Sequence, residues 1–359
     1  MDIIYNIILI FIFLLSFAEV LFLKRKKKFF FYGIVFVLIF ISGFRYEVGS
    51  DYSSYKNAFF IIQNTNKPGV EWGYHYLNKI FASFQNGFIG VFFTIAFFAI
   101  LSKAIAIFKY SHYPILVLLL YYVIYYFNGD SGQIRQNLAM GICLYATQYI
   151  FEKRFFKFLF AIILATSFHN TAIIFIFSYF IGNIKKISKN ALFLSFLIVM
   201  GLSFTDVKYI FKPIIEYFSV FDLDKKYMLY VDSKKYGQRY DFTYGDVTRV
   251  IFFFLFTINI NKMIKENKNI QLFFLLYMVS IFLYFLFRSN VIFAVRLGLY
   301  YKIFEILMIP ELIYLYRKNI RVKLTYTSIA LVYVILLYLR LWKLGSGNFL
   351  NYKNYIFME

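Results

Sequence analysis

The sequence predicts an all-α, polytopic membrane protein, because three of its properties agree. Hydrophobic residues make up 61% of the 359-residue chain, and the mean hydropathy is +0.66, well above the values of ordinary soluble domains. Apolar runs close to the length that crosses ~30 Å of hydrocarbon recur along the whole chain. Since these runs are evenly spread, we expect residues 1–359 to form a single integral membrane domain.

The first apolar run, Ile3 to Leu23, is predicted to be a retained span rather than a cleaved signal peptide. No basic residue precedes it, and no small-residue cleavage site follows it. About ten transmembrane helices are expected in all. They cover residues 3–23, 29–44, 87–108, 113–127, 137–151, 191–204, 248–260, 270–287, 291–316 and 324–341.

Residues 155–182 are expected to form a re-entrant hairpin, which turns near the segment SFHNT. At ~1.5 Å per residue, about 13 residues on each side of this segment reach only ~20 Å, which is too short for two spans. Non-helical backbone at that depth is tolerated only where protein or a water-filled cavity surrounds it.

Six basic clusters predict the orientation of the chain. If the spans alternate, all six clusters fall on one side of the membrane, which the positive-inside rule makes the cytoplasm. Most of the net charge of +21 is therefore an orientation signal, and no nucleic-acid partner is expected. Both termini and two long loops, about 45–86 and 205–247, then lie outside. The clusters are residues 24–28, Lys103 with Lys109, and residues 153–157, 185–189, 262–268 and 317–323.

The first outer loop opens with RYEVGSDYSSY, which places charges and tyrosines directly after an apolar span. Charges beside a span are costly and usually mark a site. The glycine permits a sharp reversal of the chain. A capped helix beside a snorkelling arginine is the simpler interpretation, but it needs fewer charges than are present. The candidate residues of this loop are Arg45, Glu47, Gly49, Asp51, Tyr52 and Tyr55, with Glu71 further on in VEWGYHY.

Three more candidates lie at outer turns. Arg135 and Gln136 fall in the first turn of the span that follows NGDSGQIRQNLAM, where a guanidinium can fork onto phosphate oxygens. His169 lies at the bend of the expected hairpin, where it can hydrogen-bond or deprotonate a hydroxyl. The structural alternatives are an interfacial anchor for Arg135 and a hydrogen-bonded core histidine for His169.

The segment RSNVIFAVRLGLYY adds Arg288 at the outer end of one span and Arg296 inside the next. An arginine at that depth must face the bundle interior or a cavity. Tyr300 follows four residues later on the same helical face. Arginine forks suit phosphate and tyrosine rings suit sugars, so the outer residues predict a lipid-linked sugar as substrate. Metal-binding spacings, the P-loop and GxSxG are absent, and neither a metal nor a cofactor is expected.

Five segments resemble the EpsG family in sequence and in order. They are FRYEVGSDYSSYKNAF, EWGYHYLNKI, GQIRQNLAMGI, SFHNTAIIF and RLGLYYKIFE, and they span most of residues 40–305. The family includes polysaccharide polymerases of the Wzy type. The resemblance therefore implies a glycosyltransferase that joins undecaprenyl-pyrophosphate-linked repeat units of O-antigen or exopolysaccharide at the outer face of the bacterial plasma membrane. A GT-C-like bundle is one arrangement that the expected spans allow.

The resemblance also suggests roles for the candidate residues. Undecaprenyl pyrophosphate would leave as an acceptor hydroxyl attacks, so arginines would hold the pyrophosphate and a histidine or aspartate would orient or deprotonate the hydroxyl. The catalytic residues expected on this hypothesis are Arg45, Asp51, Arg135, His169 and Arg296. Those expected to contact substrate are Glu47, Gly49, Tyr52, Tyr55, Glu71, Gln136, Arg288 and Tyr300.

The expected partners are the lipid-linked repeat units, membrane lipid, a chain-length regulator and a flippase. Two alternatives stay open. The chain could be another lipid-sugar transferase, such as an O-antigen ligase, which adds one unit instead of many. It could also be a lipid-linked oligosaccharide flippase, which should carry charged residues through the whole depth of the membrane.

Overall fold

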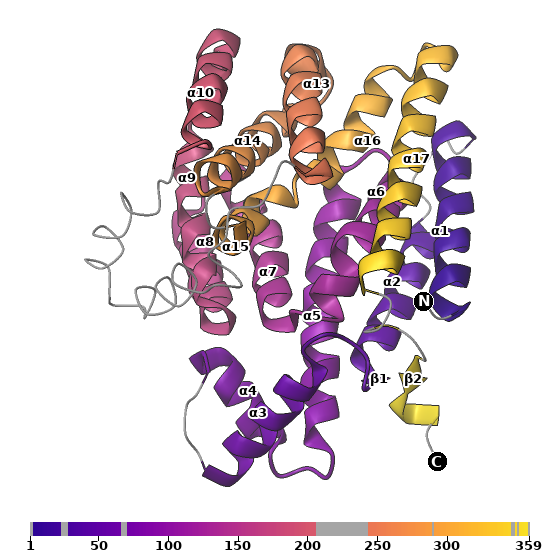
Figure 1. Cartoon of the computed structure of the whole chain (residues 1–359), viewed down its shortest axis with the longest axis vertical. Coiled ribbons are helices and arrows are strands. Elements are labelled where there is room, and N and C mark those ends of the chain that lie inside the picture. The colour runs from indigo at the N-terminus through magenta and orange to yellow at the C-terminus, as the bar shows by residue number, and fades with distance from the viewer. Residues whose placement is uncertain are drawn as a thin grey trace. The chain divides into compact units, whose positions relative to one another are not determined.

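The computed structural model describes residues 3–22, 28–65, 70–205, 243–288, 291–345, 349 and 352–357 (Figure 1). Almost all regular structure in this part of the chain is helical, which confirms the predicted all-α membrane class. The chain forms two compact units. Unit 1 comprises Met1–Tyr149, Phe156–Ala172 and Ile309–Glu359, and unit 2 comprises Ile150–Phe155 and Ile173–Met308.

Most helices coincide with apolar runs of the sequence, whereas α3 and α4 lie in the predicted outer loop 45–86. Those that begin in unit 1 are α1 (Ile3–Leu21), α2 (Lys28–Gly43), α3 (Tyr52–Thr65), α4 (Trp72–Phe81), α5 (Gly87–Tyr110), α6 (Pro114–Tyr121), the π-helix η1 (Tyr122–Asp130), α7 (Ile134–Phe151), the 3₁₀ helix η2 (Asn170–Ile176), α17 (Ile320–Gly345) and η6 (Tyr355–Phe357). Those that begin in unit 2 are α8 (Phe155–Phe168), α9 (Phe177–Ile181), α10 (Lys189–Leu202), α13 (Tyr244–Glu266), α14 (Ile270–Leu286), α15 (Val291–Lys302) and α16 (Glu305–Leu315).

Four helices of the described part are long and apolar enough to cross a membrane alone, namely Ile3–Leu21, Gly87–Tyr110, Tyr244–Glu266 and Ile320–Lys343. Further apolar helices have 10–17 residues. The number of spans and the re-entrant hairpin stay predictions. The predicted span 291–316 is divided, because α15 ends at Lys302 and α16 begins at Glu305. An ion pair of 2.6 Å between Lys302 Nζ and Glu305 Oε1 lies at this division.

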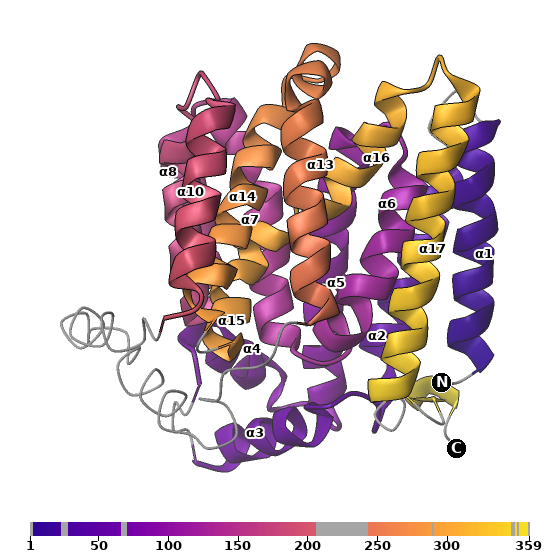
Figure 2. The ribbon, with the colours of Figure 1, turned by 45° about the horizontal axis from the view of Figure 1, so that its top comes forward.

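In unit 1, α2 packs along α5 and α1 packs along α6. Gly43 allows the close approach of α2 to α5, because an added Cβ would lie 3.1 Å from the Cα of Phe93. Figures 1 and 2 show α3 and α4 lying across one end of the long helices of this unit. Their buried tyrosines pack on α5 and on the start of α7. The described residues of the predicted first outer loop thus form a helical layer at the end of this unit's bundle.

A two-stranded ribbon joins distant parts of the chain in unit 1. Strand β1 (Arg45–Tyr46) pairs antiparallel with β2 (Lys353–Asn354), with Arg45 opposite Asn354. Tyr355 continues the pairing through its backbone N–H, which donates to the carbonyl of Phe44 at 2.8 Å. No feature of the sequence analysis predicts this ribbon.

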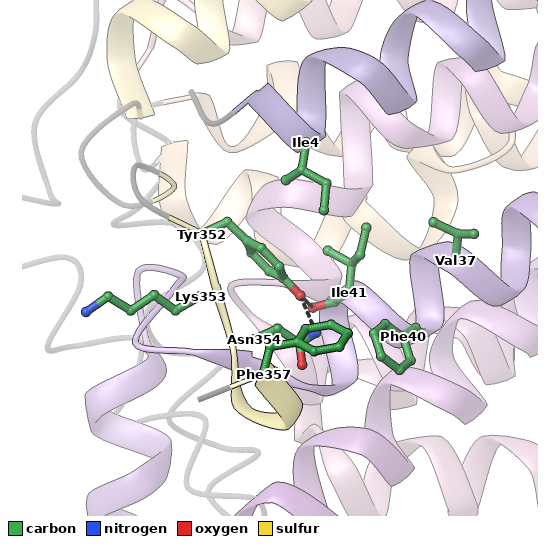
Figure 3. Close-up of a pocket in the computed structure, with 8 residues that line it drawn as sticks. All are labelled: Ile4, Val37, Phe40, Ile41, Tyr352, Lys353, Asn354 and Phe357. Atoms are coloured by element: carbon green, nitrogen blue, oxygen red, sulfur yellow. Dashed lines mark hydrogen bonds between the residues drawn. The ribbon is translucent and has the colours of Figure 1, made fainter. Parts of the chain in front are cut away.

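Beside the ribbon lies an apolar pocket of about 510 Å³, lined by side chains of α1, α2 and the segment that contains β2 (Figure 3). Two of its polar side chains are hydrogen-bonded, since Tyr352 OH donates to the carbonyl of Ile41 at 3.0 Å and Asn354 Nδ2 donates to Tyr352 OH at 2.9 Å. The pocket therefore offers hydrocarbon contact but few free polar groups.

Candidate substrate-binding site

Arg45 is a buried arginine that organises the turn around it. Its side chain is 3% exposed, and its Nε donates to the carbonyl of Val48 at 3.1 Å, while Nη1 donates to the carbonyl of Ser42. The guanidinium carbon lies 4.8 Å from the centre of the Phe92 ring. Its Nη2 is buried and has no hydrogen-bond partner in the described part of the chain. Burial lowers the pKa of Arg45 from its usual value, against the influence of nearby tyrosines.

The turn that follows Arg45 presses against the turn before α7. Glu47 and Gly49 have φ values of 54° and 108°. Glycine is needed at the second position, because an added Cβ would also overlap the carbonyl oxygen of Ser131. The sequence prediction that Gly49 allows a chain reversal is therefore confirmed, and the glycine also permits close contact with the turn that leads to α7.

Arg135 lies in the first turn of α7, as the sequence predicts, and forms an ion pair with Glu71. Its guanidinium carbon is 5.3 Å from the Tyr74 ring centre and 5.6 Å from that of Tyr55. Glu71 is the N-cap residue of α4, so the ion pair joins the starts of two helices. The Arg135 side chain keeps 25% of its surface exposed, which leaves it open to a ligand.

Buried tyrosines lie near both Arg45 and Arg135. Tyr52 packs on Phe92 at 5.2 Å between ring centres, and Tyr55 packs on Tyr74 at 6.0 Å. Burial raises the pKa of Tyr52 to about 12, and it raises the pKa of Tyr55 despite the positive charge of Arg135. Both phenols are therefore protonated hydrogen-bond donors at neutral pH.

His169 lies between α8 and η2, and its Nδ1 is 2.7 Å from Thr171 Oγ1. The end of α8 meets the start of α4, because an added Cβ on Gly73 would overlap Ser167 Oγ. Gly73 follows Glu71 by two positions. Unit 1 therefore brings the histidine segment to the helix end that holds the Arg135–Glu71 ion pair.

The remaining candidates of unit 1 differ in exposure. Glu47 is exposed, Asp51 is half-buried and Gln136 is buried. Within the described residues, no ion pair joins Asp51 to Arg45, although the two lie in one turn. Asp51 accepts a backbone hydrogen bond of 3.0 Å from Tyr55 through its carbonyl. In that same part of the chain, no group of three or more His, Cys, Asp or Glu side chains could hold a metal ion.

Arg288, Arg296 and Tyr300 belong to unit 2. Arg288 is 4% exposed, and its Nε lies 3.8 Å from Asp246 Oδ1. Arg296 is half-buried on α15, and Tyr300 is fully buried. A clamp made of Arg135 and Arg296 combines residues of two units and remains a prediction.

Sequence reasoning missed a buried charge network. Lys103 Nζ lies 2.6 Å from Asp130 Oδ1, and Tyr121 OH donates to Asp130 Oδ2 at 2.5 Å. Both charged side chains have no exposed surface. The sequence places Lys103 with Lys109 in a basic cluster that predicts the cytoplasmic side, and the structure adds that this lysine is buried beside Asp130, the partner that its desolvation requires. A lysine inside an otherwise apolar run is the one sequence signal that could have shown it.

A second missed residue is Arg249 of unit 2. Its guanidinium carbon lies 3.6 Å from the centre of the Tyr284 ring, and its Nη1 donates to the carbonyl of Gly245 at 2.8 Å. It lies one turn after Asp246, which closes a capping box with Thr243 at the start of α13. The predicted outer loop 205–247, which precedes Arg249 in the sequence, lies mostly outside the described residues.

The comparison with protein-family models yields one match, described as the EpsG family, which covers residues 28–354. No curated protein and no solved structure matches the chain. The matched range includes every candidate residue from Arg45 to Tyr300.

Proposed function

The chain belongs to the EpsG family, and from this membership we propose that it is a polysaccharide polymerase of the bacterial plasma membrane. The proposed substrates are oligosaccharide repeat units of O-antigen or exopolysaccharide, each linked to undecaprenyl pyrophosphate. In this proposal, about ten helices span the membrane, residues 155–182 form a re-entrant hairpin, and the tyrosine-lined site lies on the outer side. A chain-length regulator and a flippase are proposed as partners.

In the proposed reaction, a hydroxyl oxygen of the acceptor unit attacks the anomeric carbon of the growing chain. A new glycosidic C–O bond forms, and the bond between that carbon and the pyrophosphate oxygen breaks. Undecaprenyl pyrophosphate leaves with the bonding electron pair, and the hydroxyl proton passes to His169 or Asp51. Pyrophosphate is a good leaving group, so neutralising its charge is the main task of the protein.

The observation that carries this proposal is the setting of Arg135. The guanidinium is partly exposed, lies near two tyrosine rings, and is paired with a carboxylate that a phosphate can replace. The rings of Tyr55 and Tyr74 offer faces on which a sugar can pack. Arg45 has a different role in the proposal, because two of its three nitrogens bond to backbone carbonyls and only Nη2 remains for a ligand.

One observation bears on the flippase alternative. Lys103 and Asp130 are charges buried within unit 1, as a translocation pathway would require. However, they neutralise each other, and Tyr121 binds the second carboxylate oxygen, so the network is internally satisfied. This argues against a translocation pathway through the pair and leaves the polymerase as the better proposal.

The test is a reconstitution in liposomes with a defined undecaprenyl-pyrophosphate repeat unit from the host. We expect a ladder of products from the wild type, and a loss of about 10²–10³-fold in rate for Arg135→Ala. Arg154→Ala is the matched control, because Arg154 also pairs with a glutamate but lies on an exposed surface. A single added unit would indicate a one-step transferase. Movement of the lipid between leaflets without a new bond would indicate a flippase.

A further inference from the structure

The buried network of Lys103, Asp130 and Tyr121 takes no part in the reaction proposed above. The side chains of Lys103, Asp130 and Tyr121 come from α5, η1 and α6 respectively, and Lys103 and Tyr121 each donate to one carboxylate oxygen of Asp130. Hydrophobic residues of similar volume often replace a buried ion pair without loss of stability. Stability alone therefore does not explain why directed charges occupy this position.

On one side, the network reaches Arg45. Ser42 Oγ donates to the backbone carbonyl of Asp130 at 2.7 Å, and the carbonyl of Ser42 accepts from Arg45 Nη1. The next residue, Ser131, presents its carbonyl oxygen to Gly49, where no side chain fits. Two contacts thus tie the position of Asp130 to the turn that holds Arg45.

On the other side, the network reaches Arg135, which follows Asp130 by five residues. Backbone hydrogen bonds close the intervening turn, from Ser131 N to the carbonyl of Tyr126 and from Gln133 N to the carbonyl of Asn128, both at 2.9 Å. The turn ends where α7 begins. The π-helical geometry that precedes it is rare and is frequently found at functional sites.

We infer that Asp130 is a positioning residue of the proposed polymerase, and the inference rests on that proposed function. Lys103 and Tyr121 hold the two carboxylate oxygens, and Asp130 holds the turns that carry Arg45 and Arg135. Hydrogen bonds with fixed directions specify a single arrangement, which apolar packing specifies less sharply. The network therefore sets the spacing of the arginines that face the pyrophosphate.

The mildest test compares Tyr121→Phe with Tyr122→Phe in the liposome assay. Both variants remove one buried hydroxyl, but the hydroxyl of Tyr122 donates to the carbonyl of Tyr5 at 3.0 Å and lies outside the network. We expect kcat to fall about 10- to 100-fold in Tyr121→Phe with a smaller change in KM, since small displacements at a reacting centre cost up to ~10²-fold. Equal rates for the two variants would overturn the inference.

The second test separates positioning from folding. Lys103→Met combined with Asp130→Leu removes both charges, and we expect it to keep the thermal unfolding midpoint while the rate stays about 10²-fold below that of the wild type. Recovery of the wild-type rate in this double variant would show that the pair is only structural. If the double variant does not fold, the tyrosine comparison decides.

The activity of the wild type distinguishes a failure of the proposed function from a failure of the inference about Asp130. A wild type that forms no ladder would overturn the proposed function and this inference together. A wild type that forms a ladder, with Tyr121→Phe and the double variant equally active, would overturn the inference alone.

Discussion

Glu71 forms an ion pair with the guanidinium of Arg135. On the proposed function, an incoming pyrophosphate would have to displace this carboxylate or share the arginine with it. The same ion pair would hold Arg135 in place before a substrate binds. At the scale of single residues, the site is a set of arginines whose ordinary partners are carboxylates, carbonyls and tyrosine rings.

If Glu71 and the phosphate compete for Arg135, substitutions of Glu71 and of Arg135 should have opposite effects on the use of the donor substrate. We expect Glu71→Gln to lower KM for the lipid-linked donor several-fold, because the competing charge is gone while a hydrogen-bond acceptor remains. Arg135→Gln should instead lower kcat/KM by about 10²-fold or more. Initial rates over a range of donor concentrations measure both. If both variants lose activity to the same extent, the pair is structural and the arginine does not bind the phosphate.

The buried tyrosines predict an alkaline limit to stability. The pKa of Tyr52 is raised to about 12 by burial, while an unfolded tyrosine titrates near ~10. The contribution of Tyr52 is therefore fully present below pH ~10 and is lost as the pH rises towards 12, where the unfolded state releases its proton first. We expect the thermal unfolding midpoint in detergent to be constant from pH 8 to about 9.5 and to fall above pH ~10. Tyr52→Phe should make that fall less steep, and an unchanged slope would contradict the assignment.

At the scale of elements, the site depends on turns that hold helix ends together. The turn after β1 packs on the turn before α7, and the start of α4 packs on the end of α8. These contacts use glycines where no side chain fits. The candidate site is thus an arrangement of helix ends, in which the positions of the turns matter as much as the functional side chains.

Two glycines offer a matched pair of substitutions. We expect Gly49→Ala to lower the free energy of unfolding by about 1–3 kcal/mol, because the residue has a φ of 108° and its new methyl would overlap the Ser131 carbonyl. Gly33→Ala lies within α2 with no atom near the added Cβ, and should be neutral or stabilising by up to ~1 kcal/mol. Thermal unfolding of both purified variants measures the difference. Equal midpoints would show that the turn adapts freely.

The sequence located the helices because apolar runs are a local property of the chain. The first turn of α7 with Arg135, the break between α8 and η2 at His169 and the reversal at Gly49 all followed from local residues. The π-helix, the division between α15 and α16 and the pairing of β1 with β2 did not, since each depends on which distant segments pack together. Lys103 shows the same limit, because its place inside an apolar run indicates burial but not that Asp130 is its partner.

At the scale of the whole molecule, the charge distribution predicts which ends of the helices face the cytoplasm. With Lys103 removed from the count, the other basic residues of the six clusters still predict the same side. The only cysteine of the chain, Cys143, is fully buried, so single cysteines introduced elsewhere report topology with little background.

We expect a cysteine at Lys186 or Lys265 to react with a membrane-impermeant maleimide only from the cytoplasmic side. A cysteine at the exposed Glu47 should react only from the outer side. Right-side-out and inverted vesicles provide the measurement, and the wild type with Cys143 alone is the unlabelled control. Labelling of Lys186→Cys and Glu47→Cys from the same side would contradict the predicted topology.

The pairing of β1 with β2 has a consequence for how the protein is made. About 300 residues separate the two strands, and the helices between them must be synthesised before β2 leaves the ribosome. At a synthesis rate of ~5–20 residues per second, β2 is therefore made roughly 15–60 s after β1. During that interval the turn that holds Arg45 lacks the strand that pairs with it. A chain that stops before β2 would therefore lack the backbone hydrogen bonds of this ribbon, including the one from Tyr355 N to the carbonyl of Phe44.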